Sequence, residues 1–206
     1  PLASITKVMM AVSATLHKDK NEKIVIRPES IEDGYDLGLT KNQSWTLGEL
    51  LKYTLVFSSN DGAQAVADSF GGSNIFVAQM NADAKALGLA SIFTDPAGRD
   101  VGSRLGGSGT ALDVAKLLAV ARKNIPELLD ATNKKRSTVT ANGGRLTGIP
   151  NTNQQVESLP GAEASKTGYT DLAGGNLAII VDVTIGHPVV LVVLGSTKEG
   201  RFKDID

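Results

Sequence analysis

The sequence of 206 residues contains no cysteine and only two histidines. The lack of cysteine excludes disulfide bonds, thiol catalysis and zinc sites built on thiolates. His17 lies in a helix end rich in lysine and aspartate, and His187 lies in a Gly-His-Pro turn. Neither has clustered carboxylates at a metal-ligand spacing, so we interpret both as structural or solvated. A catalytic triad based on histidine is therefore not expected.

The chain also lacks a charge bias and a long apolar run. Its net charge is −1 and it has no long basic segment, so no nucleic-acid partner is expected. The longest apolar stretch, Val189 to Leu194, is far shorter than the roughly 18 residues that span a bilayer. No signal peptide is visible, and its absence says little about location or membrane attachment. The hydrophobic fraction of 41% is ordinary for a globular protein.

The apolar pattern predicts helices first and a sheet late in the chain. Helical spacing after Ser4 predicts a helix with Ser4 as its N-cap or first-turn residue. Further helices are expected from a capping box at Thr46, after Asn60, over 75–87 and from Thr110, with a loop over 94–109. Strands are expected at 24–27, near 138–140, and at 166–169, 176–184 and 189–196, the last two as an antiparallel hairpin. This order favours an α+β fold, an antiparallel sheet packed against a helical cluster.

Ser4 and Lys7 form the first of three short motifs that carry chemistry. Three residues apart on a helix, the two side chains share a face and can meet. A serine hydroxyl needs a base to become a nucleophile, and lysine serves only when it is neutral. Lowering a lysine pKa from about 10.4 to near 7 takes roughly 4 kcal/mol from burial and a nearby positive charge, for which Lys166 is a candidate. The apolar residues after Lys7 predict that this helix is buried.

The second and third motifs are Ser58-Ser59-Asn60 and Lys166-Thr167-Gly168. The Ser58 hydroxyl and the Asn60 amide lie between two predicted helices, where they can project into a cleft or simply cap the following helix. Lys166 offers a fixed charge and Thr167 a hydroxyl for a carboxylate, while Gly168 lets a ligand lie close to the strand. The backbone N–H groups of Tyr169 and Ser4 are candidates for an oxyanion hole.

These motifs, in this order, resemble the penicillin-binding protein and serine β-lactamase superfamily, and most of all its low-molecular-mass D-alanyl-D-alanine carboxypeptidases. The resemblance continues between the motifs, at Phe93-Thr94-Asp95-Pro96-Ala97-Gly98, Thr110-Ala111-Leu112-Asp113 and Asn151-Thr152-Asn153, and so covers nearly the whole chain. It implies a β-lactamase/transpeptidase-like fold. It also implies that residues 1–206 form one catalytic domain, without the strands that usually precede the nucleophile and without the C-terminal helix.

The resemblance also implies roles for the motif residues. Ser4 would be the acyl-ester nucleophile and Lys7 its general base, with Ser58 and Asn60 as the second wall of the site. Lys166 and Thr167 would bind the substrate carboxylate. Arg201 occupies a position where some members of the family carry a carboxylate-binding arginine. The alternative is a surface arginine at the start of a helix.

The implied reaction removes the terminal D-alanine from a peptidoglycan stem peptide, needs no metal or organic cofactor, and is inhibited by β-lactams that acylate Ser4. The implied location is extracytoplasmic. A D,D-endopeptidase that cuts cross-links would use the same residues and remains open. A class A β-lactamase needs a deacylating glutamate in a Glu-x-x-Leu-Asn segment, and Glu127, Glu157 and Glu163 lack that context. A binding protein without turnover would not be expected to retain Ser4 and Lys7.

Overall fold

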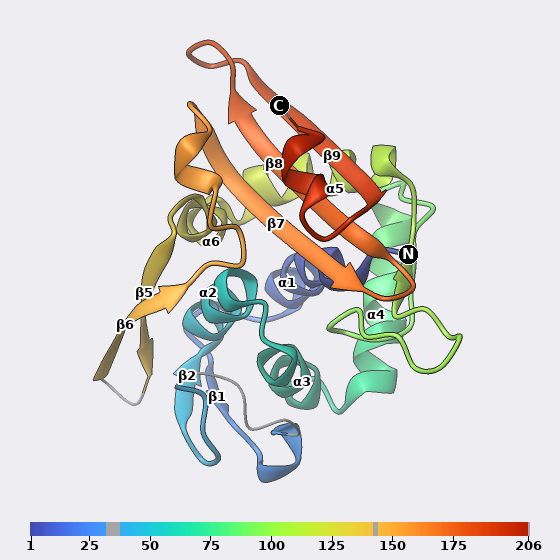
Figure 1. Cartoon of the computed structure of the whole chain (residues 1–206). Coiled ribbons are helices and arrows are strands. Elements are labelled where there is room, and N and C mark those ends of the chain that lie inside the picture. Colours follow the sequence, from blue (N-terminus) through green and yellow to red (C-terminus); the bar gives the residue numbers. More distant parts are fainter. Residues whose placement is uncertain (32–37, 142–143, 206) are drawn as a thin grey trace.

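A computed structural model describes residues 1–31, 38–141 and 144–205, and it places the long strands after the helical part of the chain (Figure 1). The α-helices are α1 (Thr6–His17), α2 (Leu47–Phe57), α3 (Asn60–Ser69), α4 (Ser73–Ala86), α5 (Ala111–Asn124), α6 (Pro126–Asp130) and α7 (Gly200–Lys203). The strands are β1 (Lys23–Val25), β2 (Ser44–Thr46), β3 (Ile92–Phe93), β4 (Gly107–Ser108), β5 (Arg136–Ala141), β6 (Gly144–Pro150), β7 (Ala162–Thr170), β8 (Gly174–Asp182) and β9 (Pro188–Ser196). Short 3-10 turns are η1 (Ala3–Ile5), η2 (Pro28–Ser30), η3 (Ala131–Asn133) and η4 (Val156–Ser158).

The largest sheet in the described residues has three antiparallel strands in the order β7-β8-β9. The predicted hairpin is confirmed, with Leu177 opposite Val193 and Val181 opposite Val189. In Figure 1, α7 lies in front of this sheet and α5 behind it, and both helices contact β8 and β9. The remaining strands pair as β1-β2, β3-β4 and β5-β6. The α+β prediction is therefore confirmed.

Helix α1 runs through the centre of the molecule. Residues 6–14 are all buried, as the apolar sequence after Lys7 predicted. Helices α2, α3, α4 and α5 surround α1 and pack against it. Any polar group in its first turn is therefore withdrawn from water and must find its hydrogen bonds inside the protein. No helix in the described parts of the chain is both long and apolar enough to cross a bilayer.

Local capping signals explain where several helices begin. The Thr46 side chain accepts a hydrogen bond from the Glu49 N–H, which confirms the predicted start of α2. Thr110 caps α5 in the same way, through the Asp113 N–H. Helix α6, which was not predicted, begins at Pro126, a residue whose fixed φ suits the first helical position.

Ser4 is not the N-cap of α1, so that part of the prediction is wrong. Ser4 lies within η1, and Ile5, the residue before α1, already has helical dihedral angles of −60° and −30°. An N-cap needs an extended backbone so that its side chain can reach back to the first N–H groups. Because the 3-10 turn runs directly into α1, the Ser4 hydroxyl is directed elsewhere.

The loop between β3 and β4 packs directly against the turn that carries Ser4. Gly98 has a φ of +80°, and a Cβ at this position would lie 2.0 Å from the Ala3 carbonyl oxygen. Only a residue without a side chain permits this contact. The loop backbone is consequently held at a fixed distance from η1.

Substitution of Gly98 tests this contact. Gly98→Ala is expected to destabilise the protein by more than the ~1 kcal/mol that a positive φ costs an alanine, because the backbone must also move away from Ala3. Gly102→Ala is the matched control, since Gly102 lies in the same loop with a φ of +59° but has open space around its Cβ position. Urea unfolding measures both variants. Equal losses of stability in the two would contradict the proposed contact.

Candidate active site

Ser4 and Lys7 lie side by side in the interior. The Lys7 Nζ atom is 2.8 Å from the Ser4 Oγ atom, as their three-residue spacing predicted. Lys7 is fully buried and Ser4 is half-buried. The hydroxyl therefore borders the surface while the amine beneath it is shielded from water.

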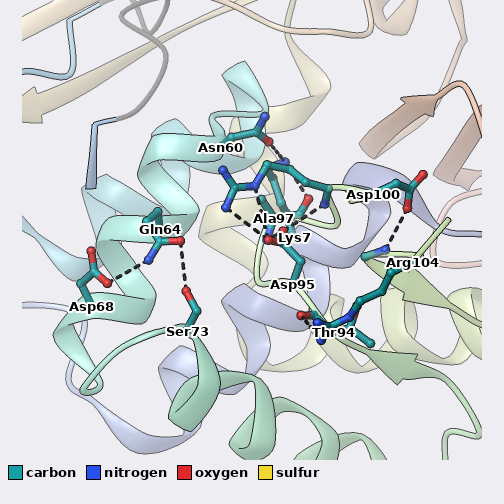
Figure 2. A network of polar contacts seen from close by, with 12 residues as sticks. Lys7, Asn60, Gln64, Asp68, Ser73, Thr94, Asp95, Ala97, Asp100 and Arg104 are labelled. Atoms are coloured by element: carbon teal, nitrogen blue, oxygen red, sulfur yellow. Dashed lines mark hydrogen bonds and ion pairs between the residues drawn. The ribbon is translucent and has the colours of Figure 1, made fainter. Parts of the chain in front are cut away.

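Two further segments also supply oxygens to Lys7. Lys7 Nζ donates to Asn60 Oδ1 at the start of α3 and to the Ala97 carbonyl in the β3–β4 loop, each at 2.9 Å. Figure 2 shows Lys7 between Asn60 and Ala97, with Asp95 beside the loop. Asp95 Oδ1 accepts hydrogen bonds from the backbone N–H groups of Ala97 and Arg99, and so fixes the turn that presents the Ala97 carbonyl.

The identity of these three oxygens determines what Lys7 can do. The amide oxygen of Asn60 and the carbonyl of Ala97 only accept hydrogen bonds, whereas the Ser4 hydroxyl both donates and accepts. A neutral amine has two N–H groups and one lone pair. If Asn60 and Ala97 take the two N–H groups, the lone pair is left for the Ser4 proton. The arrangement fits a general base.

Ser58 lies between α2 and α3 with a left-handed backbone, φ 64° and ψ 34°. This conformation is uncommon for a residue other than glycine, and such strain tends to occur at functional sites. The Ser58 Oγ atom accepts a hydrogen bond of 2.8 Å from Lys166 Nζ. Ser59 is the residue that caps α3, by accepting from the Gly62 N–H. Ser58 and Asn60 therefore face two different lysines rather than capping the helix.

Lys166 is buried on β7 and also donates to the carbonyl of Thr167, at 2.8 Å. Burial, together with the positive charges of Lys7 and Arg201, holds the pKa of Lys166 well below its usual range. The sequence predicted a fixed positive charge at Lys166. Because its pKa is lowered, whether Lys166 carries this charge depends on pH and on nearby charges. The repulsion between Lys7 and Lys166 is mutual, so protonation of either amine opposes protonation of the other.

Gly168 brings β7 up against η1, the turn that carries Ser4. A Cβ at Gly168 would lie 2.9 Å from the Leu2 carbonyl and 3.2 Å from the Ser4 nitrogen. The strand backbone therefore runs beside the Ser4 N–H. Tyr169 is the next residue along and is 44% exposed. An oxyanion hole formed by the N–H groups of Ser4 and Tyr169 stays a prediction that this placement makes sterically reasonable.

Arg201 is buried at the start of α7, so the alternative of a surface arginine is wrong. Its Nη1 atom donates to the Gly168 carbonyl at 2.7 Å. Burial lowers the pKa of Arg201 from its usual value. The guanidinium thus braces the strand segment that follows Lys166 and Thr167, and its role in binding a carboxylate stays a prediction.

Two contacts at the site were not assigned from the sequence. One is the Ala97 carbonyl described above. The other is Thr152, whose Oγ1 atom lies 2.6 Å from Thr167 Oγ1. Both belong to segments that the family resemblance had marked, but a backbone carbonyl and a single hydroxyl give no signal of their own in a sequence.

The remaining candidates lie elsewhere in the structure. His17 pairs with Asp83, and His187 contacts the Ile185 carbonyl within its turn. Glu127 pairs with Lys20, Glu157 accepts from the Lys135 N–H, and Glu163 pairs with Arg122. Both histidines are exposed and lie outside the motifs, which fits the prediction that they are structural or solvated. Each of the three glutamates is bonded to a residue outside the motifs.

Comparison with known proteins decides the family. The D-alanyl-D-alanine carboxypeptidase family matches residues 1–198. The chain belongs to this family. It is therefore a serine peptidase with a penicillin-binding protein fold, which confirms the resemblance seen in the sequence.

The relatives of this chain are named for two activities, D-alanyl-D-alanine carboxypeptidase and D-alanyl-D-alanine endopeptidase. The chain is 31% identical to a D-alanyl-D-alanine carboxypeptidase of Mycobacterium tuberculosis, over 97% of this chain and 68% of the relative. It is also 31% identical to a D-alanyl-D-alanine endopeptidase of Escherichia coli, over 99% of this chain and 66% of the relative. The chain thus spans about two thirds of the length of these proteins.

Solved structures show the same fold. A D-alanyl-D-alanine carboxypeptidase from Mycobacterium tuberculosis superposes with a TM-score of 0.84 at 30% identity, covering 96% of this chain and 75% of that one. Penicillin-binding protein D2 from Listeria monocytogenes, in its ampicillin-bound form, has a TM-score of 0.82 at 29% identity, covering 99% and 83%.

The lowered pKa of Lys166 predicts a specific pH dependence of stability. In the unfolded chain a lysine titrates near pH 10.4, so between the lowered pKa and that value the unfolded chain binds more protons. The free energy of unfolding should therefore rise with pH over this window, by at most about 1.4 kcal/mol per pH unit. Lys166→Met should remove this rise, as measured by urea unfolding from pH 6 to pH 10. The exposed Lys134→Met variant should keep it, and parallel curves for Lys166→Met and the wild type would contradict the prediction.

Proposed function

We propose that this chain is a serine-type D-Ala-D-Ala carboxypeptidase that removes the terminal D-alanine from peptidoglycan stem peptides through an acyl-enzyme on Ser4. The observation that carries the proposal is the set of contacts around Lys7. Two acceptors that cannot give up a proton occupy two positions on the amine, and the Ser4 hydroxyl occupies the third. This arrangement activates a nucleophile without a histidine.

In the acylation step, the Ser4 Oγ atom attacks the carbonyl carbon of the penultimate D-alanine, and its proton passes to Lys7. The negative charge on the carbonyl oxygen is stabilised by the N–H groups of Ser4 and Tyr169. The C–N bond then breaks, and the departing amine takes up the proton that Lys7 received from Ser4, relayed through the Ser58 hydroxyl. Lys7 is thereby neutral again before deacylation. The terminal D-alanine leaves, and an ester joins Ser4 to the rest of the peptide.

In the deacylation step, water attacks the ester carbonyl and gives its proton to the amine of Lys7. The C–O bond breaks and the proton returns to Ser4 Oγ, which releases the shortened peptide. Lys7 thus serves as base in both halves of the cycle. Asn60 and Ala97 hold it in one position throughout.

We assign the substrate carboxylate to Lys166 and Thr167 on β7. Lys166 donates to Ser58 and to Thr167 within the described residues, which leaves one proton of an ammonium for a ligand. The Thr167 hydroxyl is adjacent, and Arg201 adds positive charge behind the strand. An anionic ligand favours the protonated form of Lys166, so we expect substrate binding to offset the lowered pKa of this residue.

Cutting of peptidoglycan cross-links is the second candidate function. Relatives of Pseudomonas aeruginosa and Escherichia coli that are 32% and 31% identical to this chain are named D-alanyl-D-alanine endopeptidases. The same nucleophile and base would perform this reaction. Incubation with a D-Ala-terminated monomer and with a cross-linked dimer distinguishes the two activities by their products.

The same proposal leads us to expect inhibition by β-lactams and a location in the cell envelope. The ampicillin-bound and cefotaxime-bound structures of the Listeria relative support acylation of Ser4 by β-lactams. A substrate in peptidoglycan places the activity outside the cytoplasmic membrane. Glu127, Glu157 and Glu163 are bonded elsewhere, so we expect the penicilloyl ester to persist rather than be hydrolysed quickly as in a class A β-lactamase.

The Ser4→Ala variant tests the nucleophile. Incubation of the wild type with benzylpenicillin should add the mass of one penicillin, and Ser4→Ala should show no adduct by intact-mass spectrometry. Release of D-alanine from a D-Ala-D-Ala peptide should fall by at least about 10³-fold. An adduct that survives in Ser4→Ala would rule out Ser4, and rapid hydrolysis of penicillin by the wild type would favour a β-lactamase.

Thr152 is predicted to position the Thr167 hydroxyl. In the structure the Thr167 hydroxyl donates to Thr152 Oγ1. For Thr167 to donate to a carboxylate instead, the bond must reverse so that Thr152 donates to Thr167, and Thr152→Val removes that donor. Thr152→Val should raise KM for a D-Ala-D-Ala peptide about 2- to 10-fold with kcat nearly unchanged, the effect of one hydrogen bond. Thr152→Ser should restore KM. A purely structural role would instead lower kcat as well, and the exposed Thr140→Val variant serves as the control.

A further inference from the structure

The groups of the proposed site lie on elements that are distant in the sequence. The Ala97 carbonyl that holds Lys7 belongs to the β3–β4 loop, whereas the Tyr169 N–H of the proposed oxyanion hole lies one residue before the end of β7. Such groups have to stay within roughly 0.5 Å of the productive geometry. A contact that fixes the loop relative to the end of the strand therefore bears on the reaction.

Asp100 makes this connection through both oxygens of its carboxylate. Its Oδ1 atom accepts a hydrogen bond of 2.8 Å from the Gly106 N–H within the loop, and its Oδ2 atom accepts one of 2.5 Å from the Thr170 hydroxyl. Figure 2 shows Asp100 on the same loop as Ala97, with Ala97 next to Lys7. Asp100 is half-buried, so these hydrogen bonds are partly shielded from water.

On the loop side, the connection reaches the turn that holds Ala97. The Gly106 carbonyl accepts hydrogen bonds from the N–H groups of Thr94 and Asp95, at 3.0 and 3.1 Å. The Asp95 carboxylate in turn accepts from the Ala97 N–H at 2.8 Å. Gly106 therefore links Asp100 to the turn that presents the Ala97 carbonyl.

On the strand side, the connection reaches the proposed oxyanion hole. Thr170 is the last residue of β7, and residues 171–172 after it are exposed. The Thr170 hydroxyl accepts from the Ala173 N–H at 3.0 Å while it donates to Asp100. Because Tyr169 directly precedes Thr170, a shift of Thr170 also moves the Tyr169 N–H.

The chemistry of the two donors explains why a carboxylate suits this position. A backbone N–H and a hydroxyl each give a proton, and a carboxylate can accept at both of its oxygens. Asp100→Ala removes both acceptors. Asp100→Asn can still accept from the Gly106 N–H with its oxygen and donate to the Thr170 oxygen with its amide. The asparagine variant therefore keeps the connection while it removes the negative charge.

We propose that Asp100 is a positioning residue for the acylation of Ser4. Its carboxylate ties the β3–β4 loop to the end of β7, and it thereby fixes the Ala97 carbonyl relative to the Tyr169 N–H. Asp100 acts through these groups and not on the substrate itself. This role rests on the proposed function, which assigns Ser4 as the nucleophile and the Tyr169 N–H to the oxyanion hole.

The rate of acylation by benzylpenicillin measures this role. Rapid quenching followed by intact-mass spectrometry, at a series of penicillin concentrations, separates the acylation rate constant from the apparent dissociation constant. Asp100→Ala should lower the rate constant about 10- to 100-fold, since a misplacement of about 1 Å costs about 10²-fold. The dissociation constant should change less than about threefold, because the connection acts on the transition-state geometry.

The extent of acylation separates positioning from stability. In Asp100→Ala, the fraction of protein that is acylated at completion should equal that of the wild type. A residue that only stabilised the fold would lower this fraction and leave the rate constant of the folded protein unchanged.

Three further variants test the connection itself. Asp100→Asn should keep the acylation rate constant within about threefold of the wild type. Thr170→Val should lower it, and adding Asp100→Ala should lower it little further, because the two residues share one hydrogen bond. Asp171→Ala is the control, since it removes an exposed carboxylate beside the same strand end, and it should change the rate constant by less than about twofold.

Four results would overturn the role of Asp100. They are a wild-type rate constant in Asp100→Ala, an equal loss in Asp100→Asn, an equal loss in Asp171→Ala, and losses that multiply when Asp100→Ala and Thr170→Val are combined. Acylation of the wild type at Ser4 reports on the proposed function separately. If the wild type is not acylated, the proposed function fails and the role of Asp100 fails with it.

Discussion

The buried amine of Lys7 is the constraint on which the rest of the site depends. An amine withdrawn from water must have its hydrogen bonds satisfied inside the protein, since an unsatisfied polar group costs several kcal/mol, of the order of 2–7. The turn η1, the start of α3 and the β3–β4 loop each contribute one oxygen. These three segments are distant in sequence, so the position of Lys7 couples the assembly of the helical core to the assembly of the site.

Bringing these segments together requires unusual backbone conformations at two positions. Gly98 permits the loop to touch the Ala3 carbonyl, and Ser58 takes a left-handed conformation between two helices. Both features are unfavourable or restrictive locally and persist because the surrounding packing holds them. The result is a site whose polar groups are oriented before any ligand arrives, which is what electrostatic stabilisation of a transition state requires.

Lys7 and Arg201 both lie close enough to Lys166 to influence its charge. Lys166 is disfavoured as a cation by burial and by Lys7 and Arg201. In the proposed mechanism Lys7 acts as a neutral amine beside Ser4, and the substrate carboxylate binds near Thr167. A ligand that ends in a carboxylate would offset the unfavourable charge of Lys166, whereas a neutral ligand would not. The electrostatics around Lys166 are thus consistent with the proposed substrate.

Sequence alone determined the local features of this protein. The pairing of Ser4 with Lys7, the caps at Thr46 and Thr110, and the β8–β9 hairpin depend on residues a few positions apart, so spacing and pattern were enough to predict them. The order of the motifs indicated the family and hence the fold.

Only the tertiary structure decided which residues from distant segments of the chain contact one another. The burial of Arg201, the contact of Thr152 with Thr167, and the Ala97 carbonyl at Lys7 depend on how loops and strands pack, and no local pattern encodes them. The N-cap prediction for Ser4 failed for a related reason. The turn η1 packs against β7 and against the β3–β4 loop at Gly98, and these long-range contacts determine its backbone conformation. They override the local preference of serine for an N-cap position.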